Sequence, residues 1–322
     1  MTPLIKDTLW VQVASRWTRM TQMANFKKGP GVNADLSFVM IPGNPGNDRF
    51  YEYFGEQLME VMLGSGYHHR VEFVSVCHLN HVELPPEKRA DSNGQYGARY
   101  VLQDQIQHKI EFCRAFINIH SKTVLIGHSI GAYIALKVFP QLQKDGYNVL
   151  KCVGLFPTLE NMATTANGRR MYTALQFFDN HDLLTRAICS WLWLLPTSVK
   201  RILVRPFLRG LVPECCVDAA TEIVNTNVIR NIIHMSRDEL DRILDHDETL
   251  FATDREKLLL YYGIIDGWVP GEAPEQQLKR FGDSMVTIDS DNCEHAFVLR
   301  HTEVMARNVV HILEKVFLEA KE

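Results

Sequence analysis

The sequence predicts an α/β fold with a mostly parallel central sheet, helices on both faces of that sheet and a helical insertion. Three observations support this prediction. Short apolar runs at 36–41, 71–77 and 151–157 alternate with segments of helical periodicity, as in βαβ units. Residues 171–250 contain no clear strand and interrupt that alternation. Finally, a Gly-x-Ser-x-Gly pattern around Ser129 joins an apolar strand to a helix.

The first half of the chain alternates between strand and helix patterns. The predicted strands cover 8–24 (as a pair followed by a turn), 36–41, 71–77, 123–126 and 151–157. The predicted helices cover 51–63, 100–119 and the run after Ser129. Two prolines and two glycines at 42–46 predict a rigid turn, and the polar segment 78–94 with its Pro-Pro pair predicts a loop.

The second half returns to the same alternation only after the helical region. Strand character reappears at 257–263 and 285–288, and a last helix is expected over 303–319. We therefore predict a core made of residues 1–159 and 256–322, with a helical cap inserted at 160–255. A chain of 322 residues is long enough for such a domain with an insertion.

Composition excludes several function classes. The formal net charge is -4, so no nucleic-acid partner is expected. Seven scattered cysteines without a C-x-x-C pair indicate a reducing compartment rather than a disulfide framework. No secretory signal and no apolar run of ~18 residues is apparent, which predicts a soluble or peripheral protein. The histidine pairs 68–69 and 78 with 81 lack partner ligands, so neither a metal nor a cofactor is expected.

The pattern Gly127-x-Ser129-x-Gly131 is typical of a nucleophile elbow. A serine on a sharp strand-to-helix turn sits in strained backbone geometry, with its hydroxyl pushed out at the edge of the sheet. Side chains two residues before and after it would collide with the turn, so glycine suits both positions. The following helix begins just behind the serine, and its N-terminus favours negative charge there.

A serine hydroxyl needs a base to take its proton and an acid to orient that base. In α/β-hydrolases these residues follow in the order serine, acid, histidine. Asp266 comes directly after the strand pattern at 257–263, and His295 lies in a loop after the last predicted strand. Both positions are at the carboxyl edge of a parallel sheet, as is Ser129. The sequence thus predicts a Ser129, Asp266 and His295 triad.

Other residues compete for these roles. The alternative acids are Glu160, Asp289 and Asp291. The alternative bases are His301 and His311, although both fall in helical patterns. Asp266 also precedes a glycine, a pair that is common in plain turns. His128 adjoins the nucleophile, but a neighbour on a sharp elbow points away from it, so we expect a structural role for His128.

A tetrahedral intermediate also needs backbone hydrogen-bond donors. One is expected from Ile130, the residue after the nucleophile. The other is expected from the 42–46 turn, where we favour the N–H of Asn44 because Pro45 has none. The alternative is that this segment is only a tight turn.

The predicted cap contains an apolar stretch at 187–212. Its large residues Trp191, Trp193, Leu194, Leu195 and Phe207 are expected to be partly cap core. Basic residues lie among them: Lys200, Arg201, Arg205 and Arg209. Aromatic and basic residues together are also typical of segments that lie on a membrane surface. Pro196 and Pro206 are expected to divide the stretch into short helices.

Taken together, these pieces resemble the lipid droplet-associated hydrolases, a family with the α/β-hydrolase fold. The matching segments span about residues 36–300: Ile-Pro-Gly-Asn-Pro-Gly at 41–46, Gln-Ile-Gln-His-Lys at 105–109, Leu-Ile-Gly-His-Ser-Ile-Gly at 125–131, Leu-Phe-Pro-Thr at 155–158, Asn-Gly-Arg at 167–169, Tyr-Tyr-Gly at 261–263 with Asp266 and Trp268, and Glu-His-Ala-Phe at 294–297. Ser129, Asp266 and His295 fall on the triad positions of that family. The N-terminal forty residues and the cap contribute little to the likeness.

The resemblance implies a serine hydrolase of lipid esters, cholesteryl esters among them, on lipid droplets and the cytosolic face of the endoplasmic reticulum. The stretch 187–212 is then the expected contact with the lipid surface. The alternative is a droplet-surface binding or scaffold protein whose triad is little used. Haloalkane or epoxide chemistry on this fold normally uses an aspartate nucleophile, and the serine at 129 argues against it.

Overall fold

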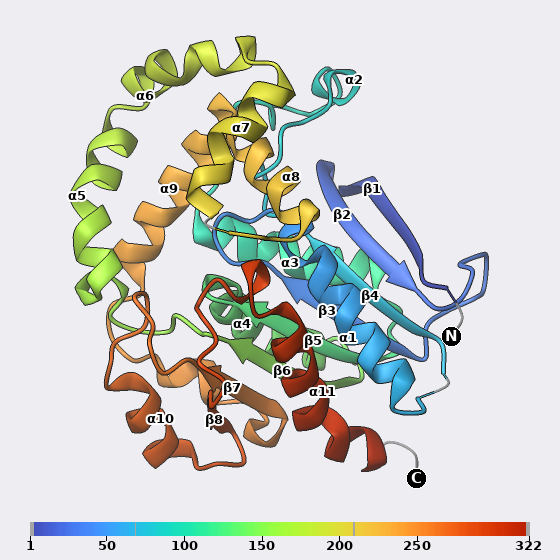
Figure 1. The fold of residues 1–322 in the computed structure, drawn as a ribbon. Coiled ribbons are helices and arrows are strands. Elements are labelled where there is room, and N and C mark those ends of the chain that lie inside the picture. The colour runs from blue at the N-terminus through green and yellow to red at the C-terminus, as the bar shows by residue number, and fades with distance from the viewer. Residues whose placement is uncertain (1–2, 68, 209, 320–322) are drawn as a thin grey trace.

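The computed structural model describes residues 3–67, 69–208 and 210–319 (Figure 1). Its central feature is an eight-stranded sheet with the order β1-β2-β4-β3-β5-β6-β7-β8. The pairs β1–β2 and β2–β4 are antiparallel, and the pairs from β4–β3 to β7–β8 are parallel. The predicted mostly parallel sheet is therefore confirmed, with an antiparallel hairpin added at one edge.

The strand bounds agree closely with the apolar runs of the sequence. The strands are β1 (Ile5–Val13), β2 (Arg16–Ala24), β3 (Leu36–Ile41), β4 (Val71–Val76), β5 (Lys122–His128), β6 (Val149–Leu155), β7 (Leu258–Tyr262) and β8 (Val286–Ile288). Every residue of β3 and β4 is buried, because helices cover both faces of a parallel sheet. The hairpin turns at Ala14 and Ser15, where φ is 45° and 66°. Neither residue gives the usual sequence signal for such a turn.

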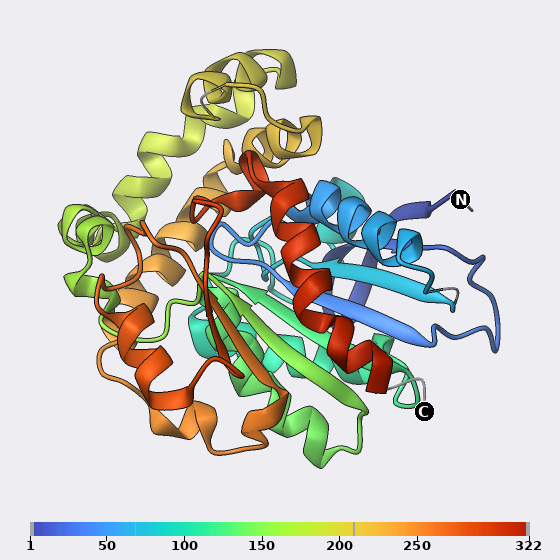
Figure 2. The ribbon, with the colours of Figure 1, turned by 60° about the horizontal axis from the view of Figure 1, so that its bottom comes forward.

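Helices cover both faces of the sheet, as Figures 1 and 2 show. The blue α1 (Glu52–Gly64) and the red α11 (Thr302–Glu319) pack side by side on one face. On the opposite face lie α3 (Leu102–Phe116), α4 (Ile130–Lys144) and α10 (Ala273–Phe281). A short α2 (Pro86–Arg89) lies inside the segment predicted as a loop.

The two faces of the sheet have separate apolar cores. Phe38 and Val124 pack on the α1 and α11 side, whereas their neighbours Val39 and Leu125 pack on the α3 and α4 side. This alternation follows from the period of two in a strand. Together the cores hold the carboxyl ends of β5, β6 and β7 in fixed positions, and the candidate site lies at those ends.

A buried charge cluster holds the segment between β3 and α1. The Arg19 guanidinium on β2 donates to the carboxylate of Asp48 at 2.9 Å and to that of Glu222 at 2.9 Å. Asp48 begins the short helix η1 (Asp48–Tyr51), and Glu222 lies on α8 (Glu214–Ile223). Because these charges are paired, they can stay buried, and they join β2, η1 and α8 near the site.

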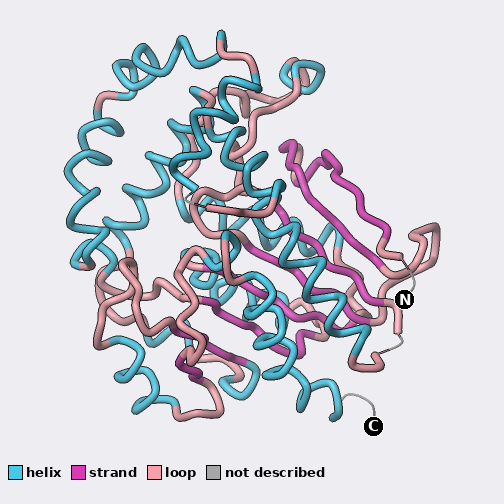
Figure 3. Tube along the Cα trace, in the orientation of Figure 1, coloured by secondary structure: helices cyan, strands magenta, loops and turns pink. Residues whose placement is uncertain are grey.

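Between β6 and β7 the chain forms a run of helices that rises away from the sheet (Figures 2 and 3). These helices are α5 (Ala166–Asn180), α6 (Asp182–Cys189), η3 (Ser190–Leu194), α7 (Thr197–Leu208), α8 and α9 (Thr226–Arg242). Pro196 separates η3 from α7 as expected, but Pro206 lies inside α7. The prediction that Pro206 breaks the helix is wrong: Pro206 lies inside α7, near the end of its described residues, where its missing N–H removes one backbone hydrogen bond without ending the helix.

Candidate active site

Ser129 lies between β5 and α4 in a strained backbone conformation, with φ 56° and ψ -125°. The flanking glycines are required by close backbone contacts. A Cβ at Gly127 would lie 2.2 Å from the Gly131 carbonyl oxygen, and a Cβ at Gly131 would lie 2.3 Å from the Ile41 carbonyl oxygen. The turn predicted from the sequence pattern is therefore present, with the serine at its tip.

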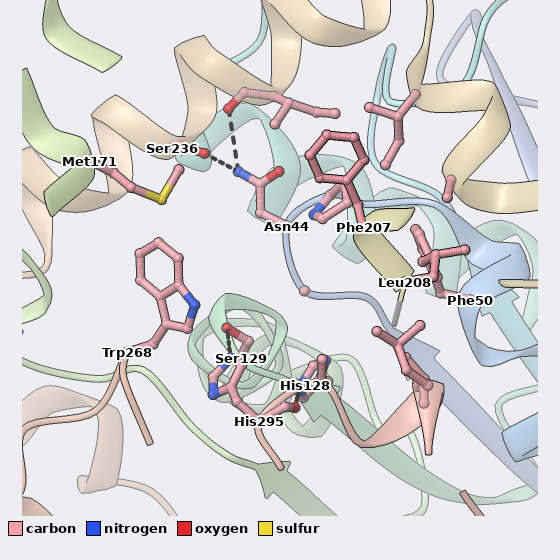
Figure 4. Close-up of a pocket in the computed structure, with 18 of the residues that line it drawn as sticks. Asn44, Phe50, His128, Ser129, Met171, Phe207, Leu208, Ser236, Trp268 and His295 are labelled. Carbon is pink, nitrogen blue, oxygen red and sulfur yellow. Dashed lines mark hydrogen bonds between the residues drawn. The ribbon is translucent and has the colours of Figure 1, made fainter. Parts of the chain in front are cut away.

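The structure brings Ser129, His295 and Asp266 together, although they are far apart in sequence. Figure 4 shows Ser129 and His295 side by side at the floor of a pocket. Ser129 Oγ lies 2.9 Å from His295 Nε2, and His295 Nδ1 lies 2.6 Å from Asp266 Oδ2. The carboxylate can only accept, so Nδ1 carries the proton and Nε2 is free to accept the serine hydroxyl proton. This is the arrangement that a serine nucleophile needs.

Local contacts fix the loop after β7 that carries Asp266. The second carboxylate oxygen of Asp266 accepts the backbone N–H of Trp268 at 2.7 Å. The N–H of Asn167, at the start of α5, donates to the Gly267 carbonyl at 3.0 Å. A Cβ at Gly267 would lie 2.5 Å from the Asn167 side-chain nitrogen, so a larger residue here would have to displace that side chain. The carboxylate is thereby held in one orientation toward His295.

The alternative acids and bases take other partners. Glu160 accepts from Gln277, and Asp291 accepts from Asn308. Asp289 is buried, where it accepts the Tyr261 hydroxyl at 2.5 Å and the Cys293 N–H at 2.7 Å. Asp289 therefore orders the loop that carries His295. The alternative bases also lie elsewhere: His301 accepts the N–H of Glu294, and His311 is exposed beside Glu314.

The two expected oxyanion donors lie on the elements that the sequence indicated. Ile130 is the first residue of α4, where backbone N–H groups have no partner inside the helix. Asn44 lines the cavity beside Ser129. The N–H of Gly43 is taken by the Tyr51 hydroxyl at 2.8 Å, and the N–H of Gly46 by His81 Nδ1 at 2.9 Å. The roles of Asn44 and Ile130 stay predictions.

The side chain of Asn44 joins its loop to α9. Its amide nitrogen donates to Ser236 Oγ at 2.8 Å (Figure 4). The same nitrogen donates to Glu239 Oε1 at 3.1 Å. Glu239 is buried, and burial raises the pKa of its carboxyl to about 8. A carboxyl that stays protonated near neutral pH has no charge to neutralise, so it can remain in this apolar wall.

A cavity of about 640 Å³ opens above Ser129. Its walls are mostly apolar, with Trp268 and Met171 on one side and Phe207 and Leu208 of α7 on the other (Figure 4). Its volume falls in the range of ligand pockets. The arrangement suits an apolar ligand whose one reactive bond reaches the serine.

Sequence reasoning missed the residues that support the site from other elements. In the sequence, Tyr51 is only the start of a predicted helix, and nothing singles out Glu239 in its helical pattern. The structural role expected of His128 involves distant partners, because its buried side chain contacts both Tyr51 and the backbone of His295. No local pattern marks such residues, because their partners lie far away along the chain.

The helices α6, η3 and α7 carry a set of exposed apolar side chains, here called the apolar face: Leu183, Ile188, Trp191, Trp193, Leu194, Ile202 and Phe207. Trp193 is 74% exposed and Phe207 is 85% exposed. The expectation that Trp191, Trp193, Leu194 and Phe207 are cap core is therefore wrong. The inner side of α7 supplies that packing instead, through Val204 and Leu208 against α8.

The basic residues near the apolar face are partly neutralised. Arg201 pairs with Glu214 and Asp218 of α8, and Arg205 lies 3.4 Å from Glu214. Arg209 lies outside the described residues. Of the helices that are described, none is by itself long and apolar enough to cross a membrane. The pair Asp182–Leu194 and Thr197–Leu208, bent by 118°, passes that test jointly by length and composition.

Comparison with known proteins gives a consistent result. The family model for lipid-droplet associated hydrolases matches residues 34–298. The chain is 30% identical to a lipid droplet-associated hydrolase of Gallus gallus, over 84% of this chain and 82% of that protein. It is 29% identical to that of Homo sapiens, over 87% and 85% of the two chains.

Among solved structures, a serine hydrolase from Cycloclasticus zankles superposes with a TM-score of 0.59 at 15% identity. The match covers 98% of this chain and 99% of that one, and it establishes the fold. The chain therefore has the α/β-hydrolase fold and belongs to the lipid-droplet associated hydrolase family.

Proposed function

We propose that this protein is a serine hydrolase of lipid esters that acts through Ser129, His295 and Asp266. One observation carries the proposal: Ser129 is hydrogen-bonded through His295 to Asp266, and Ser129 itself lines an apolar cavity of about 640 Å³. The family to which the chain belongs carries the name hydrolase, which agrees with this chemistry.

The reaction follows from the direction of each hydrogen bond. Ser129 Oγ attacks the ester carbonyl while its proton passes to His295 Nε2, and Asp266 stabilises the imidazolium that forms. The backbone N–H groups of Asn44 and Ile130 bind the oxyanion. His295 then protonates the leaving alcohol, and an acyl group remains on Ser129. A water molecule, deprotonated by His295, releases the acid and restores the serine.

The apolar walls favour a substrate with long hydrocarbon groups. Trp268, Met171 and Phe207 offer surface for an acyl chain or a sterol. We propose lipid esters as the class and sterol esters within it. The substrate test compares emulsions of cholesteryl oleate and trioleoylglycerol. Release of oleate from cholesteryl oleate alone supports the sterol assignment, and release from trioleoylglycerol alone overturns it.

We further propose that the enzyme works at the surface of lipid droplets and on the cytosolic face of the endoplasmic reticulum. The names of the relatives place them at lipid droplets. The apolar face offers a means of attachment, because the transfer of water-exposed aromatic and leucine side chains into a lipid monolayer is favourable. The helical segment 160–255 would then be a cap that carries both the pocket wall and the attachment surface.

The deciding experiment is labelling with a fluorophosphonate, which reacts only with an activated serine. We expect the wild-type protein to be labelled and Ser129→Ala to be unlabelled at the same melting temperature. Ser65→Ala serves as the control, because Ser65 is an exposed residue at the end of α1. A Ser129→Ala protein that still labels would refute the assignment.

The apolar face also favours a second function, that of a droplet-surface binding or scaffold protein. Attachment through that face needs no catalysis. A wild-type protein that binds droplets, yet neither labels with fluorophosphonate nor releases oleate from any ester, would favour this alternative.

A further inference from the structure

A second hydrogen-bonded chain runs behind the nucleophile. The backbone N–H of Gly43 donates to the Tyr51 hydroxyl at 2.8 Å. The same hydroxyl lies 2.7 Å from His128 Nδ1. On the other side of the ring, His128 Nε2 lies 2.8 Å from the backbone carbonyl oxygen of His295 (Figure 4). The chain thus links the turn after β3, which carries the expected oxyanion donor, to the loop that carries the expected base.

The direction of every bond in this chain is fixed by its ends. A backbone carbonyl can only accept, so His128 Nε2 must carry a proton. In a neutral imidazole Nδ1 is then an acceptor, and the Tyr51 hydroxyl must donate to it. That leaves the hydroxyl oxygen free to accept the N–H of Gly43. The three bonds are therefore satisfied together in one arrangement only.

The surroundings keep His128 neutral. It is 6% exposed, and burial lowers its pKa to about 3. Burial also raises the pKa of Tyr51, which keeps the hydroxyl proton in place. Edge-to-face contacts from the rings of Phe297 and Phe156 to His128, with centroids 5.1 Å and 6.2 Å away, limit its rotation. The imidazole is thus held in the tautomer that the chain requires.

We propose that Tyr51 and His128 are positioning residues that set the oxyanion loop and the His295 loop relative to each other. The inference rests on the proposed hydrolase function. Neither residue transfers a proton in the reaction. Each acts through a backbone group: Tyr51 through the N–H of Gly43, adjacent to Asn44, and His128 through the carbonyl of His295.

This coupling has a clear use in the reaction. The oxyanion forms at the same moment as the proton reaches His295, so donors and base must be in place together. Gly43 also lies directly against the nucleophile, since a Cβ there would be 3.0 Å from Ser129 Cβ. A shift of the oxyanion loop would therefore change the space around Ser129 as well.

The test compares Tyr51→Phe with Tyr53→Phe in the full-length protein, with p-nitrophenyl butyrate as the probe. Tyr53 is a matched control, because it lies only two residues away, at the start of α1, and donates to Glu303 at 2.7 Å, away from the cavity. We expect Tyr51→Phe to lower kcat by roughly 10- to 100-fold with little change in KM, since misplacement of catalytic groups has an effect of this size. Tyr53→Phe should retain wild-type kcat.

Two substitutions at His128 test separately its hydrogen bond to Tyr51 and its hydrogen bond to the His295 carbonyl. His128→Gln can keep the donor toward the His295 carbonyl but loses the acceptor for Tyr51. His128→Asn keeps that acceptor but loses the donor. We expect both to lower kcat. Adding Tyr51→Phe to His128→Asn should lower kcat by much less than the product of the two single effects, because residues that act as one unit are not additive.

A spectroscopic readout tests the chain without turnover. The ¹⁵N chemical shifts of His128 should indicate a neutral ring protonated at Nε2, unchanged from pH 5 to 8 in the wild-type protein. A ring that titrates in that range, or one protonated at Nδ1, overturns the proposal. So does a fluorophosphonate-reactive Tyr51→Phe protein with wild-type kcat. If the wild-type protein itself does not label, the proposed function fails first, and the shifts still decide the tautomer.

Discussion

The elbow around Ser129 and the apolar face on α6 to α7 use apolar residues in opposite ways. At the elbow, apolar side chains are buried on both sides of the sheet, and the polar groups of the triad all have partners. On the apolar face, Leu183, Trp193 and Leu194 are exposed to solvent. The first arrangement stabilises the fold, and burial there holds the strained serine in position.

The difference indicates that the two regions serve different purposes, one folding and catalysis and the other contact with a partner surface. Exposed leucine and tryptophan contribute little to folding, so their presence on α6 to α7 needs another explanation. A change at the elbow should therefore alter chemistry or stability, whereas a change at Trp191, Trp193 and Leu194, which do not line the cavity, should alter attachment alone.

The largest effect should come from the triad itself. We expect His295→Ala to lower kcat by roughly 10⁶-fold and Asp266→Asn by about 10⁴-fold, because the base is lost in one and wrongly oriented in the other. Steady-state hydrolysis of p-nitrophenyl butyrate measures both, with droplet binding unchanged as the control. Near-normal rates in Asp266→Asn would exclude Asp266 as the acid and return the role to Glu160, Asp289 or Asp291.

The elbow glycines give the next largest effect. Gly131→Ala should lower the free energy of unfolding by about 3 kcal/mol or more, because its Cβ would meet the carbonyl oxygens of Ile41 and Pro42 at 2.3 Å and 2.4 Å. Urea denaturation measures the loss. Gly271→Ala is the control, since no atom lies within 4 Å of the new methyl group. Equal stability of the two variants would contradict the steric account.

The apolar face should give a change in attachment without a change in stability. We expect the triple replacement of Trp191, Trp193 and Leu194 by serine to weaken binding to trioleoylglycerol droplets coated with phosphatidylcholine at least ~100-fold, because each large side chain contributes roughly 1.5–3 kcal/mol on burial. The melting temperature should stay the same. Flotation and thermal melting measure the two quantities.

The control for that experiment is the double replacement of Phe116 and Ile119 by serine, at the far end of α3. These residues are 38% and 39% exposed and are not part of the apolar face. Droplet binding should survive in this variant. If the triple variant binds droplets like the wild type, the face has another role. If its melting temperature falls sharply, the three residues support the fold instead.

The last effect is a dependence of stability on pH, and it concerns α9, which borders both regions. The pKa of Glu239 is raised to about 8 from 4.5, so between those values the folded state holds a proton that the unfolded state has lost. Stability should therefore fall as pH rises from 5 to 8, by up to about 1.4 kcal/mol per pH unit from this group. Glu239→Gln should flatten that slope. Urea denaturation at each pH measures it, and an identical slope in the variant would show that Glu239 is not the cause.

The sequence predicts the parts of the molecule that depend on local spacing. The strands, the glycine frame of Ser129, and the positions of Asp266 and His295 after strands follow from short patterns, and the structure brings the three side chains together. The parallel order of the sheet follows from the alternation of strand and helix.

Other parts depend on contacts between distant segments. Tyr51 supports the site only because η1 lies against the end of β5. The pKa of Glu239 is raised only because this residue of α9 is buried in the folded protein. The exposure of Trp191 and Trp193 could not be predicted either, since an apolar stripe has the same spacing whether it faces a core or a solvent. The hairpin turn at Ala14 and Ser15 lacks the residues that usually favour positive φ.

Helix α7 belongs to both regions, since Phe207 lines the cavity and is also 85% exposed. If the apolar face rests on a lipid monolayer, a substrate can pass along this side chain without a stage in bulk water. Turnover would then depend on the mole fraction of ester within the interface and on droplet area, rather than on total lipid per volume. An apparent KM quoted in molar units would change with droplet diameter, while kcat would not.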